Sequence, residues 1–245
     1  MRTLHHAVTG LELQLDRQLD RDVCSLLDRE LDAIAGPLRN WGRFSAPIAL
    51  VSADDPDAIQ QLARAPVDGP LCAAATPTLI ALLTPARWPR PPSDHELRIV
   101  LCHELAHVLL FQRCAPLERT GAVALPCWFR EGMALVASEG RPSTAVRRQV
   151  AAWTDVAVLA DADAALVAAD TGRVYAAAHV LFDHWHEHHG IRRLGALSRW
   201  MRAGAGFERA YVEATGEGSA AWVAATMTQL RRWATDNGDP IRGRP

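Results

Sequence analysis

The chain has 245 residues, of which 49% are hydrophobic and 22% charged, and its formal net charge is −2. This is an ordinary globular composition, and the chain is long enough to bury a substantial core. A charge so close to zero argues against a general nucleic-acid-binding protein, because such proteins gain affinity by neutralising phosphates. No apolar stretch reaches the length of a membrane-spanning helix, and no signal-peptide segment is visible, so we expect a cytoplasmic protein.

The first 90 residues are predicted to mix strands with a helix. Three segments have the apolar patterns of strands, namely 2–15, 47–51 and 71–83. The last of these contains Pro77 and predicts an edge strand or a hairpin, because proline cannot donate a hydrogen bond to a sheet. Residues 17–39 follow a helical period that ends at Gly36, and the proline-rich segment 87–92 predicts a linker.

From residue 93 onward the chain is predicted to be helical. Ser93 and Glu96 have the spacing of a capping box, and a helix without Gly or Pro follows to about Arg113. Further helices are predicted over 126–139, 144–152, 172–189, 191–203, 205–215 and 218–234. This pattern predicts an α+β fold in a single domain over 1–235, with an α/β lobe (1–92), active-site helices (93–140), a helical lobe (141–235) and a tail (236–245).

The strongest functional signal is the sequence HELAH at residues 103–107. His103 and His107 are four residues apart on a predicted helix, so both imidazoles reach the same side and can bind one tetrahedral Zn²⁺. Glu104 lies beside them, where a carboxylate can take a proton from a metal-bound water. Two buried histidines and a glutamate are costly unless they are paired or bind a metal, although satisfied core histidines are the alternative.

Catalytic zinc requires a third protein ligand and one open position. The HExxHxxGxxH pattern is absent, because Leu110 and Arg113 stand where its glycine and third histidine would be. The candidate carboxylates downstream are Glu118, Glu131 and Glu139. Spacing favours Glu131, because 24 residues let the chain turn back and place a second helix against the first.

HELAH followed by PCWFREGMALV resembles the two motifs of the gluzincin zinc peptidases of the MA clan, and is most similar to small bacterial peptidase-MA-like domains. The resemblance implies a zincin-like fold, one Zn²⁺ per chain, Glu131 as the third ligand and peptidase activity. It also implies that Trp128 and Ala134 pack in the core, and that Gly132 permits close helix approach. No G-x-M-E-N segment precedes the first motif, so the resemblance favours an endopeptidase.

The same resemblance implies that Tyr175, near the start of a later helix, donates a hydrogen bond to the oxyanion formed during hydrolysis. A tyrosine in the core is the alternative. His179, one turn later, is expected to be a packed histidine, although it could line the cleft.

Three further features leave their roles open. The histidines of the segment HWHEHH (His184, His186, His188 and His189) could include metal ligands, but they precede Gly190 and predict a solvated helix end. Cys127 could approach the metal, although the five cysteines, an odd number without a CxxC pair, are mostly expected to be small buried residues. Arg130 could pair with a carboxylate or face solvent.

The predicted activity is therefore zinc-dependent hydrolysis of peptides or unfolded proteins, with Glu104 as the general base. We expect an extended substrate to pair with the apolar segment 78–84, taken as an edge strand. The alternatives are a catalytically silent zinc-binding module and a metal-free helical interaction protein. The sequence does not indicate cleavage specificity or oligomeric state.

Overall fold

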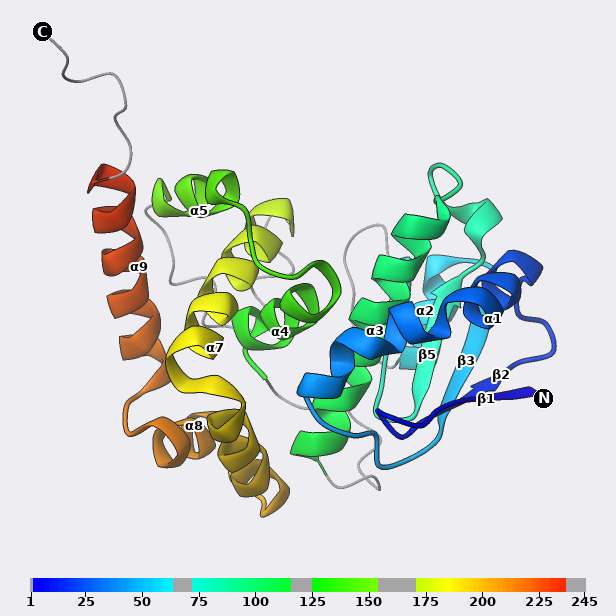
Figure 1. Cartoon of the computed structure of the whole chain (residues 1–245), viewed down its shortest axis with the longest axis horizontal. Coiled ribbons are helices and arrows are strands. Elements are labelled where there is room, and N and C mark those ends of the chain that lie inside the picture. The colour runs from blue at the N-terminus through cyan, green and yellow to red at the C-terminus, as the bar shows by residue number, and fades with distance from the viewer. Residues whose placement is uncertain (1, 64–71, 116–124, 154–170, 237–245) are drawn as a thin grey trace, which may run out of the picture. The chain divides into compact units, whose positions relative to one another are not determined.

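The computed structural model describes residues 2–63, 72–115, 125–153 and 171–236. These residues form a mixed α/β fold with one small sheet, which is compatible with the predicted α+β class (Figure 1). The chain divides into two compact units, which are described separately. The first holds the sheet and the helices up to residue 115, together with Ala137–Glu139 and Met201–Gly204, and the second holds most of the remaining helices.

The sheet of the first unit has five strands in the order β1-β2-β3-β5-β4. The strands are β1 (Arg2–His6), β2 (Leu11–Leu15), β3 (Ile48–Ala53), β4 (Ala73–Ala75) and β5 (Leu79–Leu83). The three central strands β2, β3 and β5 are parallel, whereas β1 and β4 run antiparallel to their neighbours. The sheet edges are therefore β1 and the short strand β4.

Two strand predictions need correction. The segment 2–15 is a hairpin rather than one strand, because the chain reverses at Gly10, whose φ of 68° suits a residue without a side chain. The segment 78–84 is not an edge strand, since β5 pairs with β3 on one side and with β4 on the other. The hairpin prediction for 71–83 is confirmed, and the edge position belongs to β4.

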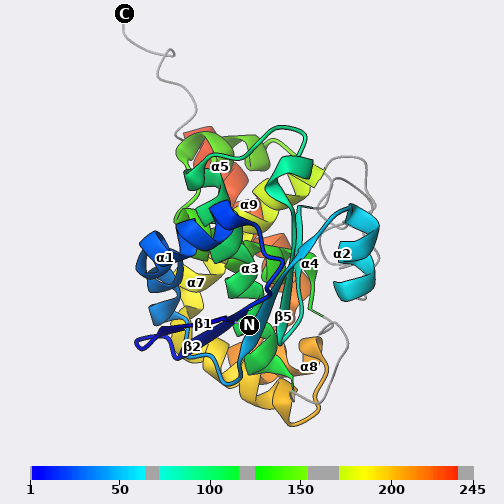
Figure 2. The same ribbon diagram turned by 90° about the vertical axis from the view of Figure 1, so that its right-hand side faces the viewer.

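Helices cover both faces of this sheet, with α1 (Arg21–Ala35) on one side and α2 (Pro56–Ala63) on the other (Figure 2). Helix α2, which packs Ile59 against Ala81 and Leu83, was not predicted from the sequence pattern. The helix predicted over 17–39 is α1 followed by a 3₁₀ turn, Gly36–Asn40. Because helices lie on both faces, four of the five residues of β5 are buried.

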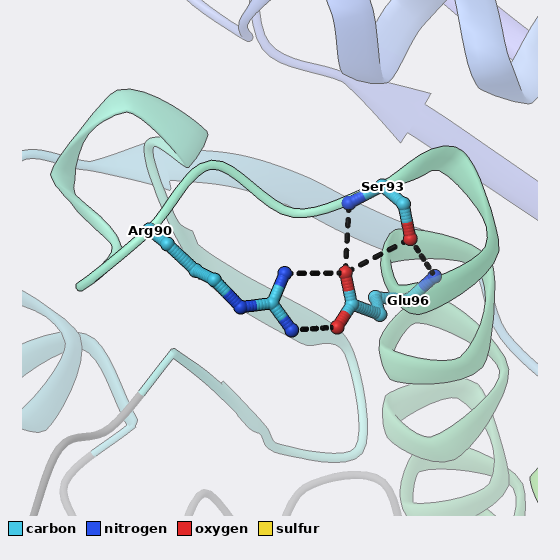
Figure 3. A network of polar contacts seen from close by, with 3 residues as sticks. All are labelled: Arg90, Ser93 and Glu96. Atoms are coloured by element: carbon cyan, nitrogen blue, oxygen red, sulfur yellow. Dashed lines mark hydrogen bonds and ion pairs between the residues drawn. The ribbon is translucent and has the colours of Figure 1, made fainter.

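Helix α3 (Asp94–Cys114) carries the HELAH sequence and begins at the predicted capping box. The Ser93 hydroxyl accepts a hydrogen bond from the Glu96 backbone N–H, and the Glu96 carboxylate accepts from the Ser93 backbone N–H (Figure 3). Arg90, in the proline-rich segment, donates to the same carboxylate from both Nη atoms. The bonds from Arg90 and Ser93 lower the pKa of Glu96 from 4.5 to about 2.

Near its C-terminal end, α3 is joined to the sheet through the buried side chain of Gln112. Its Oε1 accepts hydrogen bonds from the backbone N–H groups of Ser45, at 2.7 Å, and Ala46, at 3.3 Å. Its Nε2 donates to the carbonyl oxygens of Ala46, at 3.1 Å, and Pro77, at 2.7 Å. One side chain therefore connects α3 to the segment before β3 and to the β4–β5 turn.

The second unit is helical over the residues that the structure describes. Its elements are α4 (Cys127–Glu139), α5 (Thr144–Ala151), α7 (Thr171–Arg202), α8 (Phe207–Thr215) and α9 (Ser219–Asp236), except that the last three residues of α4 and the last two of α7 belong to the first unit. The predicted break at Gly190 is a kink within α7, where φ is 68°. Gly216 ends α8 in the left-handed conformation, as its position after the predicted helix indicates.

Aromatic side chains from four helices form the core of the second unit. Phe129 of α4 contacts the rings of Phe182, Trp185 and Phe207 in edge-to-face geometry. Trp128 stacks on Trp222 of α9 with ring centroids 5.4 Å apart. Among the described residues, no helix is long and apolar enough to cross a lipid bilayer.

Candidate metal centre

His103 and His107 are on the same side of α3, one turn apart, as the HExxH spacing predicts. Their Nε2 atoms are 3.0 Å apart. Two nitrogen ligands on a tetrahedral zinc would be separated by about 3.3 Å, given Zn–N distances of about 2.0–2.1 Å. The observed separation is therefore close to what a shared zinc ion requires.

The surroundings of these histidines are mostly apolar. His107 is buried and stacks on Phe111 with ring centroids 5.8 Å apart, and Glu104 is also buried. His103 is half-buried. Because an imidazole or carboxylate in such surroundings is costly unless it has a polar or metal partner, the chemistry of these residues fits a metal-binding helix.

Glu131 is on α4, and close contact with α7 fixes that helix. A Cβ atom placed on Gly132 would lie 2.3 Å from the Ala178 carbonyl oxygen and 2.4 Å from Cβ of Phe182. Only glycine allows α4 and α7 to approach this closely, which is the role that the motif resemblance implies for Gly132. At the C-terminal end of α4, His179 Nε2 lies 2.7 Å from the Gly140 carbonyl oxygen.

The Glu131 carboxylate is buried and forms an ion pair with the neighbouring Arg130. Arg130 Nε donates to Glu131 Oε1 at 2.8 Å, and the two side chains are 16% and 6% exposed. The sequence is compatible with either solvent exposure or a carboxylate pair for Arg130, and the structure shows the carboxylate pair. Tyr175 is half-buried and interacts electrostatically with Arg130.

Within the first unit, the Cys102 thiol lies 3.7 Å from the Ala137 carbonyl oxygen. Among the described residues, His103, His107 and Glu131 form a group of potential metal ligands, with one ligand atom from each within 4.8 Å of the others. Two nitrogens and one oxygen are a donor set that zinc accepts. Of the other predicted candidates, Glu139 is exposed and Glu118 lies outside the described residues.

Cys127 is buried on α4, as expected for a small core residue. Burial raises the pKa of its thiol to about 12, and the nearby Glu131 carboxylate acts in the same direction. Burial has the same effect on Cys102. Both thiols are therefore protonated at neutral pH in the absence of a metal.

The histidine-rich segment of α7 differs in part from the expected solvated helix end. His188 is exposed, and His184 Nε2 lies 3.2 Å from Gln229 Oε1 on α9. The side chain of His189, however, is only 8% exposed and packs beside Trp185 and Trp222. Burial, together with the neighbouring His188, lowers the pKa of His189 to about 4. For His189 the prediction of solvation is wrong, because aromatic rings cover it.

His179 is a buried, hydrogen-bonded histidine, as predicted. Two polar residues that position the helices were not predicted. One is Gln112, and the other is Asp183, which is buried on α7 and forms ion pairs with Arg141 and Arg147. The only sequence signal for either was a polar residue within an apolar run, namely LLFQ and VLFD.

No family model, curated protein or solved structure matches this chain.

Proposed function

We propose that the protein is a zinc-dependent metallopeptidase with a zincin-like catalytic core. The observation that carries the proposal is the ligand group of His103, His107 and Glu131, whose ligand atoms lie within 4.8 Å of one another. The proposal assigns these three side chains to one Zn²⁺. The buried Glu104, next to the first ligand in sequence, is assigned the role of general base.

The chemistry of the donor set supports zinc over other common ions. Two imidazoles and one carboxylate are typical of catalytic zinc sites, which keep a fourth position for water or substrate. Calcium and magnesium prefer sites made entirely of oxygen ligands, so two histidines disfavour them. The protonated thiol of Cys127 is not needed to complete the set.

Bound zinc would lower the pKa of a coordinated water and polarise the scissile carbonyl group. In the proposed reaction, Glu104 accepts the proton of the attacking water and passes it to the leaving amine. Arg130 offsets the charge of the buried Glu131. Tyr175, near Arg130, is the candidate donor to the oxygen that becomes negative in the transition state.

A peptide substrate would pair with an exposed strand edge. The segment 78–84 is excluded from this role because both sides of β5 are already paired. Strand β4 is paired with β5 on one side, and no other described strand pairs with it. Backbone pairing along Ala73–Ala75 requires a locally extended substrate, which favours peptides and unfolded segments.

Metal analysis and one conservative variant test the proposal. We expect one zinc per chain after dialysis of the purified protein, and loss of this zinc in His103→Ala. Glu104→Gln is expected to retain zinc but to lose at least ~100-fold in turnover of a mixed peptide library, as expected from removal of a general base. His95→Ala, on an exposed part of the same helix, is the matched control and should behave as wild type.

The outcomes separate the proposal from its alternatives. A wild-type protein that binds no zinc would support the metal-free interaction protein. A protein that binds one zinc but is as inactive as Glu104→Gln across broad peptide libraries would support the silent zinc-binding module. Either result rejects the peptidase.

A further inference from the structure

We propose that Arg130 is a positioning residue for the metal site, which fixes the orientation of the Glu131 carboxylate through its hydrogen bond to Oε1. This inference rests on the proposed function, because it assigns Glu131 to the metal. Arg130 is not itself a ligand, and the three proposed ligands do not explain why its guanidinium is buried. The proposal gives this buried cation a role.

The geometry of the pair is unusual for consecutive residues of a helix. Side chains at positions i and i+1 point about 100° apart, so neighbours in sequence do not normally face each other. Arg130 nevertheless brings its Nε to 2.8 Å from Glu131 Oε1. Both side chains therefore turn toward one shared polar position on α4.

The environment makes this contact strong and specific. Phe129 and Met133, on either side of the pair in sequence, are fully buried, and the pair itself is almost completely shielded from water. A hydrogen bond between charged groups is stronger and more directional when water is excluded. The Glu131 carboxylate is thus held in one orientation, rather than rotating as an exposed glutamate would.

The contact is compatible with a ligand role for Glu131. A carboxylate has two oxygens and needs only one to bind zinc, so the hydrogen bond to Oε1 does not exclude metal binding by the same group. Partners of this kind, which orient a ligand without touching the metal, typically contribute about 10–100-fold in metal affinity. The guanidinium also repels the metal ion, so Arg130 increases zinc affinity only if orienting the carboxylate has the larger effect. Whether Arg130→Met weakens or strengthens zinc binding is therefore a direct test.

The experiment measures zinc affinity, with Zn²⁺ itself as the probe and a chromophoric chelator as competitor. Arg130→Met is expected to weaken zinc binding by about 10–100-fold. Arg147→Met is the matched control, because Arg147 forms a similarly buried pair with Asp183 of α7 but does not contact Glu131. This control should bind zinc within about twofold of wild type even where its thermal stability falls.

Two further variants keep the test informative if Arg130→Met folds poorly. Arg130→Lys retains the charge but loses the planar guanidinium, and we expect an intermediate loss of affinity. In a Glu131→Gln background, Arg130→Met should cause no further loss, because the group that it orients has changed. The visible spectrum of the Co²⁺-substituted protein should also differ between Arg130→Met and wild type, and not between Arg147→Met and wild type.

The inference is overturned if Arg130→Met binds zinc as tightly as wild type or more tightly, or if Arg147→Met loses as much affinity as Arg130→Met. These results concern Arg130 only and leave the metallopeptidase proposal in place. If wild type binds no zinc, the proposed function and this inference are both wrong, so the two failures are distinguishable.

Discussion

Replacing Gly132 by alanine tests the close contact between α4 and α7. An alanine Cβ would lie within 3.0 Å of three atoms of α7, at 2.3 Å from Ala178 O, 2.4 Å from Phe182 Cβ and 2.9 Å from Ala178 C. Two of these atoms are backbone, so a side-chain rotation cannot relieve the clash. Overpacking typically costs about 1–3 kcal/mol, and contacts with backbone belong at the upper end of this range.

A second effect has the opposite sign. Alanine in a helix interior is about 1 kcal/mol more favourable than glycine. We therefore expect Gly132→Ala to lower the free energy of unfolding by about 2 kcal/mol, from about 3 kcal/mol of strain less about 1 kcal/mol of helix propensity. For a chain of this length, this corresponds to a fall in Tm of about 4 °C.

Urea unfolding followed by circular dichroism measures the change, with Gly36→Ala as the control. Gly36 has a φ of −56°, and a Cβ added there would have no neighbouring atom within 4 Å, so alanine should stabilise by about 0.4–1 kcal/mol. Opposite signs for the two variants are the expected result. A Gly132→Ala protein as stable as wild type would refute the close packing of α4 on α7.

Three further predictions follow from buried or capped polar groups. Gln112→Met removes four hydrogen bonds between the side-chain amide and the backbone, so at roughly 1 kcal/mol each the free energy of unfolding should fall by about 3 kcal/mol or more. A loss below about 1 kcal/mol would contradict the network. The Glu96 carboxyl should titrate near pH 2 by NMR, and Arg90→Ala should raise the pKa of Glu96. Because the pKa of Glu96 in the folded chain is below 4.5, the stabilisation that this carboxylate provides is present above pH 4.5 and is lost as the pH falls towards 2. His189 has a pKa of about 4 in the folded chain, whereas in the unfolded chain it binds a proton near pH 6.5. The free energy of unfolding should therefore decrease as the pH falls from about 6.5 to 4. His189→Gln should make the free energy of unfolding less dependent on pH over this range.

The helices were more predictable than the strands, and the reason is the range of the interactions involved. The start of α3 at Ser93 and the end of α8 at Gly216 depend on residues within one turn of the helix, so the spacing in the sequence is sufficient. Whether β5 is an edge strand depends instead on which segments pair with it. Residues 49–53 and 73–75 occupy its two sides, and neither partner is visible in the pattern of β5 itself.

Polar side chains show the same division. The i, i+4 spacing of His103 and His107 places them on one side of any helix, so their proximity could be predicted without a tertiary structure. The partner of Arg130 could not be predicted, because exposure and pairing are equally compatible with its position beside Glu131. Burial of both side chains excludes water there and selects the ion pair.

The amino-acid sequence alone therefore determined the helix that presents two imidazoles and a carboxylate and the cap that starts this helix. The resemblance of the second motif indicated the glycine that permits close packing. Only the tertiary structure decided the order of the strands, the burial of His189 and the contacts of Gln112, Arg130 and Asp183. Spacing along a helix is set by local hydrogen bonds between nearby residues. Burial and pairing depend on residues far apart in sequence, which meet only when the chain has folded.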